Sequence, residues 1–133
     1  MLNFIGDQYQ TPPMFSAVKV KGVPLYKHAR KGKEVEREPR FIRISKFDLL
    51  NWSNPFADFY VYCTKGTYIR CLVHDLGEKL GCGAILTGLR RTASNNLSID
   101  QAIALDTFEE HTVTGICKYL IPGYQALSGD SET

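Results

Sequence analysis

The segment 63–70 holds the residues whose types and spacing most suggest chemistry. It joins a predicted strand to a predicted helix, and such junctions often carry active-site residues. Arg70 falls in the first turn of that helix, where backbone N–H groups already present partial positive charge. A cation there costs about 0.3–1 kcal/mol at an exposed site. We therefore expect Arg70 to face a carboxylate or phosphate. The alternative is a structural ion pair with a nearby carboxylate such as Asp75.

Two elements must position Arg70. Alternation of apolar residues predicts a strand over residues 57–64. The apolar residues that follow recur with helical spacing and predict a helix over residues 68–80, with Thr67 able to cap its start and Gly81 at its end. The face of the strand consists of Ala57, Phe59, Val61 and Cys63, and the stripe of the helix consists of Ile69, Leu72, Val73, Leu76 and Leu80.

The rest of the chain predicts short elements of both kinds. Pro12 and Pro13 remove backbone donors, so residues 1–13 are expected to be an irregular lead-in. Residues 41–50 alternate and should pair with residues 57–64 across a turn at 51–55. Further strands are expected at 15–21 and 84–93, short helices at 25–31, after a cap at Ser98 or Asp100, and at 112–119, and disorder at 128–133. The fold class is therefore α+β, with a mixed, mostly antiparallel sheet and a few short helices.

Composition is that of a soluble globular protein: the 133 residues are 44% apolar and 23% charged, enough for one domain with a core. No apolar run approaches a membrane span, and the N-terminus lacks a signal-peptide pattern. The four cysteines have no metal-ligand spacing, which favours reduced thiols in a cytoplasm and no metal site. Residues 1–95 carry 15 Lys and Arg against 8 Asp and Glu, whereas residues 96–133 carry 1 against 6. A basic body of this kind is compatible with a polyanion partner, although on charge alone a solvated surface is the favoured explanation.

Two basic segments could serve such a partner. Residues 10–30 interleave Lys19, Arg30 and other cations with aromatic residues, which suits RNA phosphates and stacked bases; an ordinary charged surface is the alternative. Residues 89–92 contain Arg90 and Arg91, which in a strand would point to opposite faces. In that segment the alternative is a pair of edge-strand charges that discourage aggregation.

Taken together, three segments resemble one family. Residues 10–22 (Q-T-P-P-M-F-S-A-V-K-V-K-G) resemble the Q-x-P-P-x-[YF]-S-A-x-K-x-x-G segment of the TruB family of tRNA pseudouridine synthases. Residues 63–70 (C-T-K-G-T-Y-I-R), with D-L-G at 75–77, are similar to its C-S-K-G-T-Y-I-R…D-L-G motif. Residues 89–92 match its L-R-R-T motif. Three motifs in the right order and at family spacing identify the chain as a bacterial-type member.

The resemblance implies an enzyme that isomerises uridine-55 in the TΨC loop of tRNA to pseudouridine, with neither metal nor cofactor. Such enzymes flip the target base, break its glycosidic bond and rejoin C5 to the ribose, with an aspartate as nucleophile. By the resemblance, Arg70 pairs with that aspartate, Tyr68 lies in the base pocket and Leu89 packs against the flipped base. The RNA-facing surface would include Lys19, Arg30, Lys65 and Arg91.

The family's G-x-L-D-P-x-A-x-G motif, which carries the nucleophile, is absent from this sequence. We therefore expect residues 1–127 to correspond to the C-terminal half of the catalytic domain, followed by a disordered tail at 128–133. The chain alone should be inactive. Its expected partners are the TΨC stem-loop of tRNA, the other half of the synthase and a second copy bound through an exposed sheet edge. A non-catalytic RNA-binding or tRNA-chaperone module derived from the same family is the alternative function.

Overall fold

The computed structural model describes residues 2–110 and 112–124, and the chain divides into two compact units, Met1–Thr87 and Gly88–Thr133. The first unit contains a sheet and the helix α2 (Ile69–Leu80), together with a short helix α1 (Leu25–Ala29). The second contains only short elements. The fold class is α+β, as the sequence predicts, and every strand pairing within the described residues is antiparallel.

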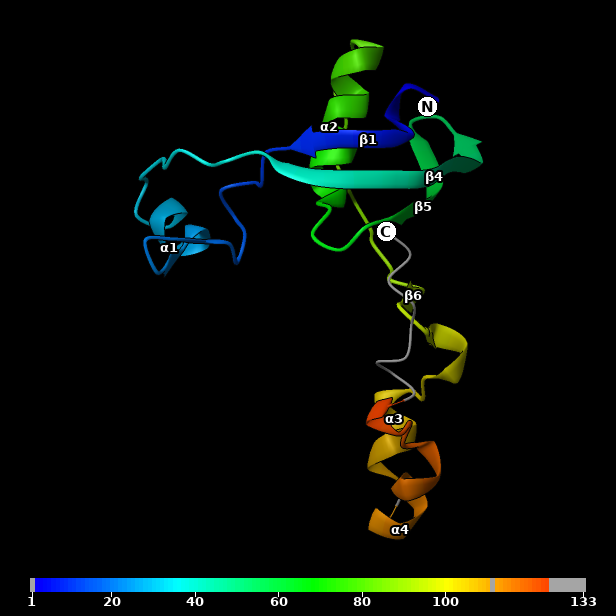
Figure 1. Ribbon diagram of the computed structural model, residues 1–133. Helices are drawn as coiled ribbons and strands as arrows, with labels where there is room; N and C mark the ends of the chain where they lie inside the picture. Colours follow the sequence, from blue (N-terminus) through cyan, green and yellow to red (C-terminus); the bar gives the residue numbers. More distant parts are fainter. Residues whose placement is uncertain (1, 111, 125–133) are drawn as a thin grey trace. The chain divides into compact units, whose positions relative to one another are not determined.

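The sheet of the first unit has the order β1-β4-β5 (Figure 1). Its central strand β4 (Arg40–Ser53) is 14 residues long and pairs with β5 (Phe56–Cys63) in the predicted hairpin. Towards its start, β4 pairs with β1 (Gly6–Gln10), from Gly6 opposite Ile44 to Gln10 opposite Arg40. A 3-10 turn η1 (Leu2–Phe4) precedes β1.

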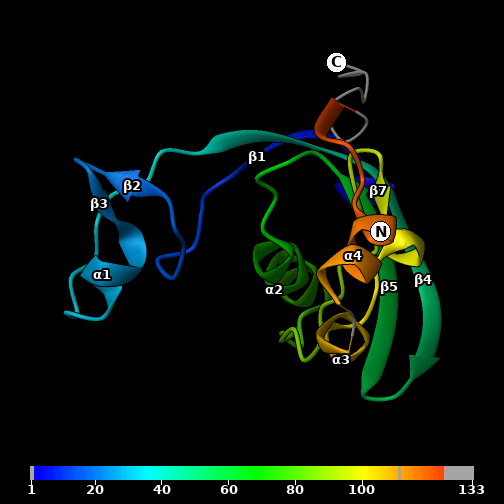
Figure 2. The ribbon, with the colours of Figure 1, turned by 90° about the horizontal axis from the view of Figure 1, so that it is seen from below.

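The core forms where α2 lies against one face of this sheet (Figure 2). The alternation predicted for β4 and β5 is confirmed, because Ile42 and Ile44 are buried and the burial of β5 alternates along the strand. Leu80, although on the predicted stripe, is exposed at the end of the helix. The cluster consists of Phe4, Ile44, Phe47, Leu72 and Leu76, with Phe59, Val61 and Cys63 packed against it.

Three predictions for the first unit are wrong. Residues 6–10 form a strand rather than an irregular lead-in; they need few apolar residues because pairing with β4 satisfies their backbone. The strand predicted over 15–21 is reduced to β2 (Lys19–Val20), which pairs with β3 (Val23–Pro24). Thr67 does not cap α2, because the helix starts at Ile69 and its N-cap residue is Tyr68; the Thr67 hydroxyl donates instead to the carbonyl of Thr64 at 2.8 Å.

The second unit also differs from the prediction in its first strand. Only Ala93 of the predicted strand 84–93 is in a strand, β6 (Ala93–Ser94), which pairs with β7 (Leu97–Ser98). Ser98 then caps the 3-10 turn η2 (Ile99–Gln101) in a capping box, as predicted. Two short helices follow, α3 (Leu105–Glu109) and α4 (Val113–Ile116), and the latter runs into η3 (Cys117–Tyr119).

The helical segment predicted at 112–119 is thus confirmed, with the Thr112 hydroxyl accepting the N–H of Gly115. The disorder predicted at 128–133 falls outside the described residues. In the part of the chain that the structure describes, no helix has both the length and the apolar character needed to span a membrane.

Candidate active site at the start of helix α2

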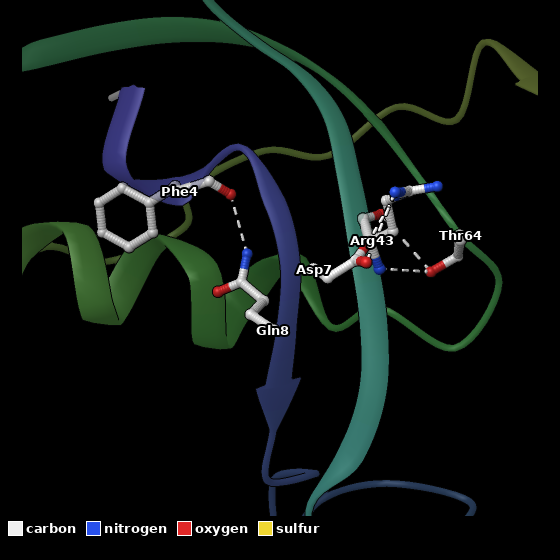
Figure 3. A network of polar contacts seen from close by, with 5 residues as sticks. All are labelled: Phe4, Asp7, Gln8, Arg43 and Thr64. Atoms are coloured by element: carbon white, nitrogen blue, oxygen red, sulfur yellow. Dashed lines mark hydrogen bonds and ion pairs between the residues drawn. The ribbon is translucent and has the colours of Figure 1, made fainter.

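The loop that leads into α2 is tied to the sheet by Thr64. Its N–H donates to the carbonyl of Arg43 at 2.9 Å, and its hydroxyl accepts the N–H of Arg43 at 3.0 Å. Figure 3 shows Thr64 beside Arg43, whose guanidinium in turn pairs with Asp7 of β1 at 2.6 Å. The loop therefore starts from a fixed point on β4, and Lys65 lies exposed directly after it.

Gln10 holds the other end of this loop. Its side-chain Oε1 accepts the N–H of Tyr68 at 2.7 Å, and its Nε2 donates to the carbonyl of Tyr68 at 3.1 Å. Tyr68 is the N-cap residue of α2, with an extended backbone and no side-chain cap of its own. An amide from the last residue of β1, 58 positions away, thus fixes the residue that begins the helix.

Residues 11–15 follow Gln10 and are held against the helix start through their carbonyl groups. The thiol of Cys71 lies 3.7 Å from the oxygen of Thr11, and Nη1 of Arg37 donates to Pro12 at 3.2 Å. Nη2 of Arg70 donates to the carbonyl of Phe15 at 2.7 Å. Residues 11–15 are in no strand, so side chains from elsewhere in the chain donate to their carbonyl groups.

Sequence reasoning singled out Arg70 but missed three of these anchors. They are Gln10, Arg37 and Cys71, whose partners lie 25 to 60 residues away. Of these three anchors, only Gln10 has a sequence signal, since it precedes the two prolines in the motif at residues 10–22.

An open cleft of about 660 Å³ lies beside Arg70. Two cations, Arg37 and Arg70, and two carboxylates, Glu34 and Asp75, contribute to its wall. Tyr68 is half-buried, and its backbone is held by Gln10, which belongs to the lining. The lining comprises Tyr9, Gln10, Thr11, Pro13, Met14, Glu34, Arg37, Arg70, Cys71, His74 and Asp75.

The guanidinium of Arg70 is exposed and makes no ion pair with Asp75 or with any other described residue. The alternative interpretation from the sequence, a structural ion pair between Arg70 and a carboxylate such as Asp75, is therefore wrong within the described part of the chain. A guanidinium has five N–H donors, and one of them is used on Phe15, so a carboxylate or phosphate can still be bound. Next to it, burial raises the pKa of the Cys71 thiol, and Asp75 adds to the effect, while Arg70 and Arg37 act in the opposite direction.

The remaining predicted residues divide between the two units. Lys19 is exposed on β2, and Arg30, at the end of α1, lies with its guanidinium 5.5 Å from the centre of the Tyr26 ring. Leu89, 67% exposed, and Arg91 belong to the second unit, outside any strand. Because Arg90 and Arg91 lie outside any strand, the prediction that they point to opposite faces of a strand is wrong. The structure thus brings Tyr68 and Arg70 together, with Lys65 in the loop before them.

No group of three or more His, Cys, Asp or Glu residues within the described ranges is arranged to hold a metal ion. The four cysteines are free thiols. The start of α2 offers an arginine open to an anion, two residues after a tyrosine whose backbone is fixed from a distant strand.

Comparison with known proteins covers almost the whole chain. The model of the TruB family pseudouridylate synthase N-terminal domain matches residues 1–69, and that of the tRNA pseudouridylate synthase B C-terminal domain matches residues 70–125. Among curated relatives, the tRNA pseudouridine synthase B of Opitutus terrae is 60% identical over 126 residues, covering 95% of this chain and 52% of that protein.

The proteins of the same name from Clostridium tetani and Pseudomonas aeruginosa are 46% and 53% identical. Those matches cover 95% and 80% of this chain but 43% and 35% of the relatives. The chain thus spans about half the length, or less, of these relatives. Two consecutive family-model matches extend from residue 1 to residue 125, and the chain belongs to the TruB family of pseudouridylate synthases.

Proposed function

We propose that this chain forms part of a tRNA pseudouridine synthase that isomerises uridine-55 in the TΨC loop of tRNA. The observation that carries the proposal is the start of α2, where Arg70 is open to an anion beside a cleft, in a chain of the TruB family. The names of the relatives, tRNA pseudouridine synthase B, support the same substrate class.

In this proposal Arg70 binds the nucleophilic aspartate and keeps it ionised, since an adjacent guanidinium favours the charged form of a carboxylate. The sequence has no G-x-L-D-P motif, so the aspartate comes from polypeptide outside these 133 residues. The reaction breaks the bond between N1 of the uracil and the ribose and forms a bond from C5 to the same ribose carbon. It is an isomerisation, so no oxidant, reductant or cofactor is consumed.

The other residues act on the RNA. Tyr68 contacts the flipped uracil and Leu89 packs against it, while Lys19, Arg30, Lys65 and Arg91 bind phosphates of the stem-loop. Unstacking a base costs a few kcal/mol, which these aromatic and basic contacts offset. The exposure of all four cations in the structure supports this assignment.

Residues 1–127 are proposed to be one half of the catalytic domain. The outer edges of β1 and β5 are unpaired within the described residues, and we propose that they are covered by the other half or by a second copy of this chain. A tRNA substrate supports the proposal that the protein acts in the cytoplasm.

Incubation of the 133-residue chain with unmodified tRNA tests the proposal at its simplest. We expect binding of the TΨC stem-loop that weakens with salt, and no pseudouridine, because the nucleophile is missing. Clear turnover by the chain alone would contradict the assignment of the nucleophile to another polypeptide. Absence of any binding to tRNA or to the stem-loop would contradict the proposed substrate.

A further inference from the structure

The buried side chain of Gln10 makes a specific pair of hydrogen bonds that apolar packing alone would not need. It is 7% exposed, and its side-chain amide makes both of its recorded hydrogen bonds to the backbone of one residue, Tyr68. An acceptor and a donor that meet the N–H and the C=O of the same residue fix both its position and its orientation.

Tyr68 is the point at which orientation matters. The helix that follows has no side-chain cap, and its first turn holds only the carbonyl of Tyr68, which accepts the N–H groups of Cys71 at 3.1 Å and Leu72 at 3.2 Å. The N–H of Tyr68 is bound by Gln10 alone among the described residues. Rotation about φ or ψ of Tyr68 would turn its side chain and shift the first helical turn, in which Arg70 lies. Held by Gln10, the backbone of Tyr68 has φ −96° and ψ 104°.

We propose that Gln10 is a positioning residue, whose two hydrogen bonds to the backbone of Tyr68 hold the tyrosine ring in the direction that receives the target uracil. The inference rests on the proposed function for the role of Tyr68. The two hydrogen bonds from Gln10 to the backbone of Tyr68, called the clamp below, stand on geometry alone. The amide of Gln10 is already engaged with Tyr68, so in this proposal Gln10 acts through Tyr68 and not by its own contact with substrate.

A matched pair of variants separates positioning from folding. Gln10→Met keeps the length of the side chain and removes both hydrogen bonds. Gln8→Met makes the same change two residues earlier in β1, where the amide donates to the carbonyl of Phe4 at 2.8 Å and does not reach Tyr68. Figure 3 shows Gln8 directed at Phe4. Thermal unfolding of both variants confirms that each is folded before the comparison is made.

Amide hydrogen exchange followed by NMR reports on the clamp without any RNA. In Gln10→Met the N–H of Tyr68 should exchange at least about tenfold faster than in the unchanged chain, since its acceptor is lost. In Gln8→Met it should keep the original rate. Unchanged protection of Tyr68 in a folded Gln10→Met protein would overturn the clamp.

Gln10→Glu supplies a second variant should Gln10→Met fail to fold. Its carboxylate can still accept the N–H of Tyr68 but cannot donate to the carbonyl until it is protonated. Protection of Tyr68, corrected for intrinsic exchange, should therefore increase as the pH falls through the titration of that carboxyl. A pH-independent protection equal to that of the unchanged chain would also overturn the clamp.

RNA binding then tests the direction of the ring. The probes are a TΨC stem-loop with the target uridine and the same stem-loop with an abasic residue at that position. Gln10→Met should reduce the preference for the uridine by the same factor as Tyr68→Ala, and the double variant should lose no more, because the two changes act through one contact. Gln8→Met should keep the preference.

The RNA-binding experiment distinguishes failure of the positioning role of Gln10 from failure of the proposed role of Tyr68. If Tyr68 loses protection while the preference for uridine is retained, the positioning role is overturned. If the unchanged chain binds both stem-loops equally, the proposed role of Tyr68 fails and the base-directed part of the inference fails with it. The exchange experiment still decides the clamp in that case.

Discussion

At the scale of single residues, Arg70 sits where the helix itself opposes its charge, and the structure supplies a polar contact for it. The carbonyl of Phe15 accepts one of its N–H groups, and no described carboxylate pairs with it. A guanidinium with unused donors at a helix start is suited to an anion that another polypeptide brings.

The thiol of Cys71 offers a local probe of this environment. Burial and the neighbouring Asp75 raise its pKa, so less thiolate forms at a given pH. Alkylation by iodoacetamide at pH 8, followed by mass spectrometry, should be slower at Cys71 than at the exposed Cys82. Asp75→Asn should speed the reaction at Cys71, because it removes a charge that disfavours the thiolate.

His74→Asn, on the neighbouring residue of α2, is the control for Asp75→Asn and should leave the ratio of the two rates nearly unchanged. A slower reaction at Cys71 in the Asp75→Asn variant would contradict the sign of this electrostatic effect.

The sequence could predict part of this site and not the rest. Arg70 and Tyr68 were identifiable because they lie in one contiguous motif with helical spacing after it. The clamp by Gln10 and the anchor by Arg37 depend on contacts between residues 58 and 25 positions apart, and no local pattern encodes such a contact. Thr67 has a residue type suited to a cap, but the helix begins one residue later than predicted, so Tyr68 occupies the N-cap position.

At the scale of elements, the end of α2 depends on Gly77. This glycine is buried, its carbonyl accepts the N–H of Gly83, and an added Cβ would overlap the backbone of Gly83 and Ala84. The same Cβ would lie 2.7 Å from the Cβ of Ala84. The glycine of the D-L-G motif is thus explained by the close return of the chain over the helix.

Gly77→Ala should therefore lower the free energy of unfolding by about 1–3 kcal/mol, the usual cost of overpacking, in spite of the better helix propensity of alanine. Gly88→Ala is the control, because its Cβ would meet nothing within 4 Å and its φ is not positive; we expect a change of about 0.5 kcal/mol or less. Urea denaturation measures both. Equal stability of the two variants would contradict the close contact.

Elements with a clear apolar period were predictable, and those without one were not. The β4–β5 hairpin and α2 carry strong alternation or helical spacing, and the structure confirms them. β1 has no such pattern and is specified by its pairing with β4. Residues 84–92 include apolar residues, but no strand within the described chain pairs with them, so they remain irregular.

At the scale of the whole molecule, the outer face of the β1-β4-β5 sheet is aromatic and open. Tyr9 and Phe41 lie in contact across the β1–β4 pair, and Tyr60 and Tyr62 follow on β5; all four are exposed. Its cations Arg43 and Lys46 are already paired with Asp7 and Asp48. Such a surface favours contact with further protein.

We expect the chain to self-associate when this surface and the sheet edges have no other partner. Light scattering should show an average mass that increases with protein concentration. The double substitution Phe41→Lys and Tyr62→Lys should suppress this increase in mass. Leu80→Lys, at an exposed position on α2, should not suppress it. A strictly monomeric chain at high concentration would contradict this prediction.

The central claim, that this chain supplies the arginine half of a pseudouridine-forming site, is tested most directly by a chimaera. The 126 matched residues of the Opitutus terrae relative are replaced by those of this chain, and pseudouridine is measured in unmodified tRNA. We expect formation at uridine-55, a loss of about a hundredfold or more with Arg70→Ala, and little change with Arg43→Ala, an arginine already paired with Asp7. A folded, tRNA-binding chimaera that forms no pseudouridine, or one whose rate is unaffected by Arg70→Ala, would contradict the claim.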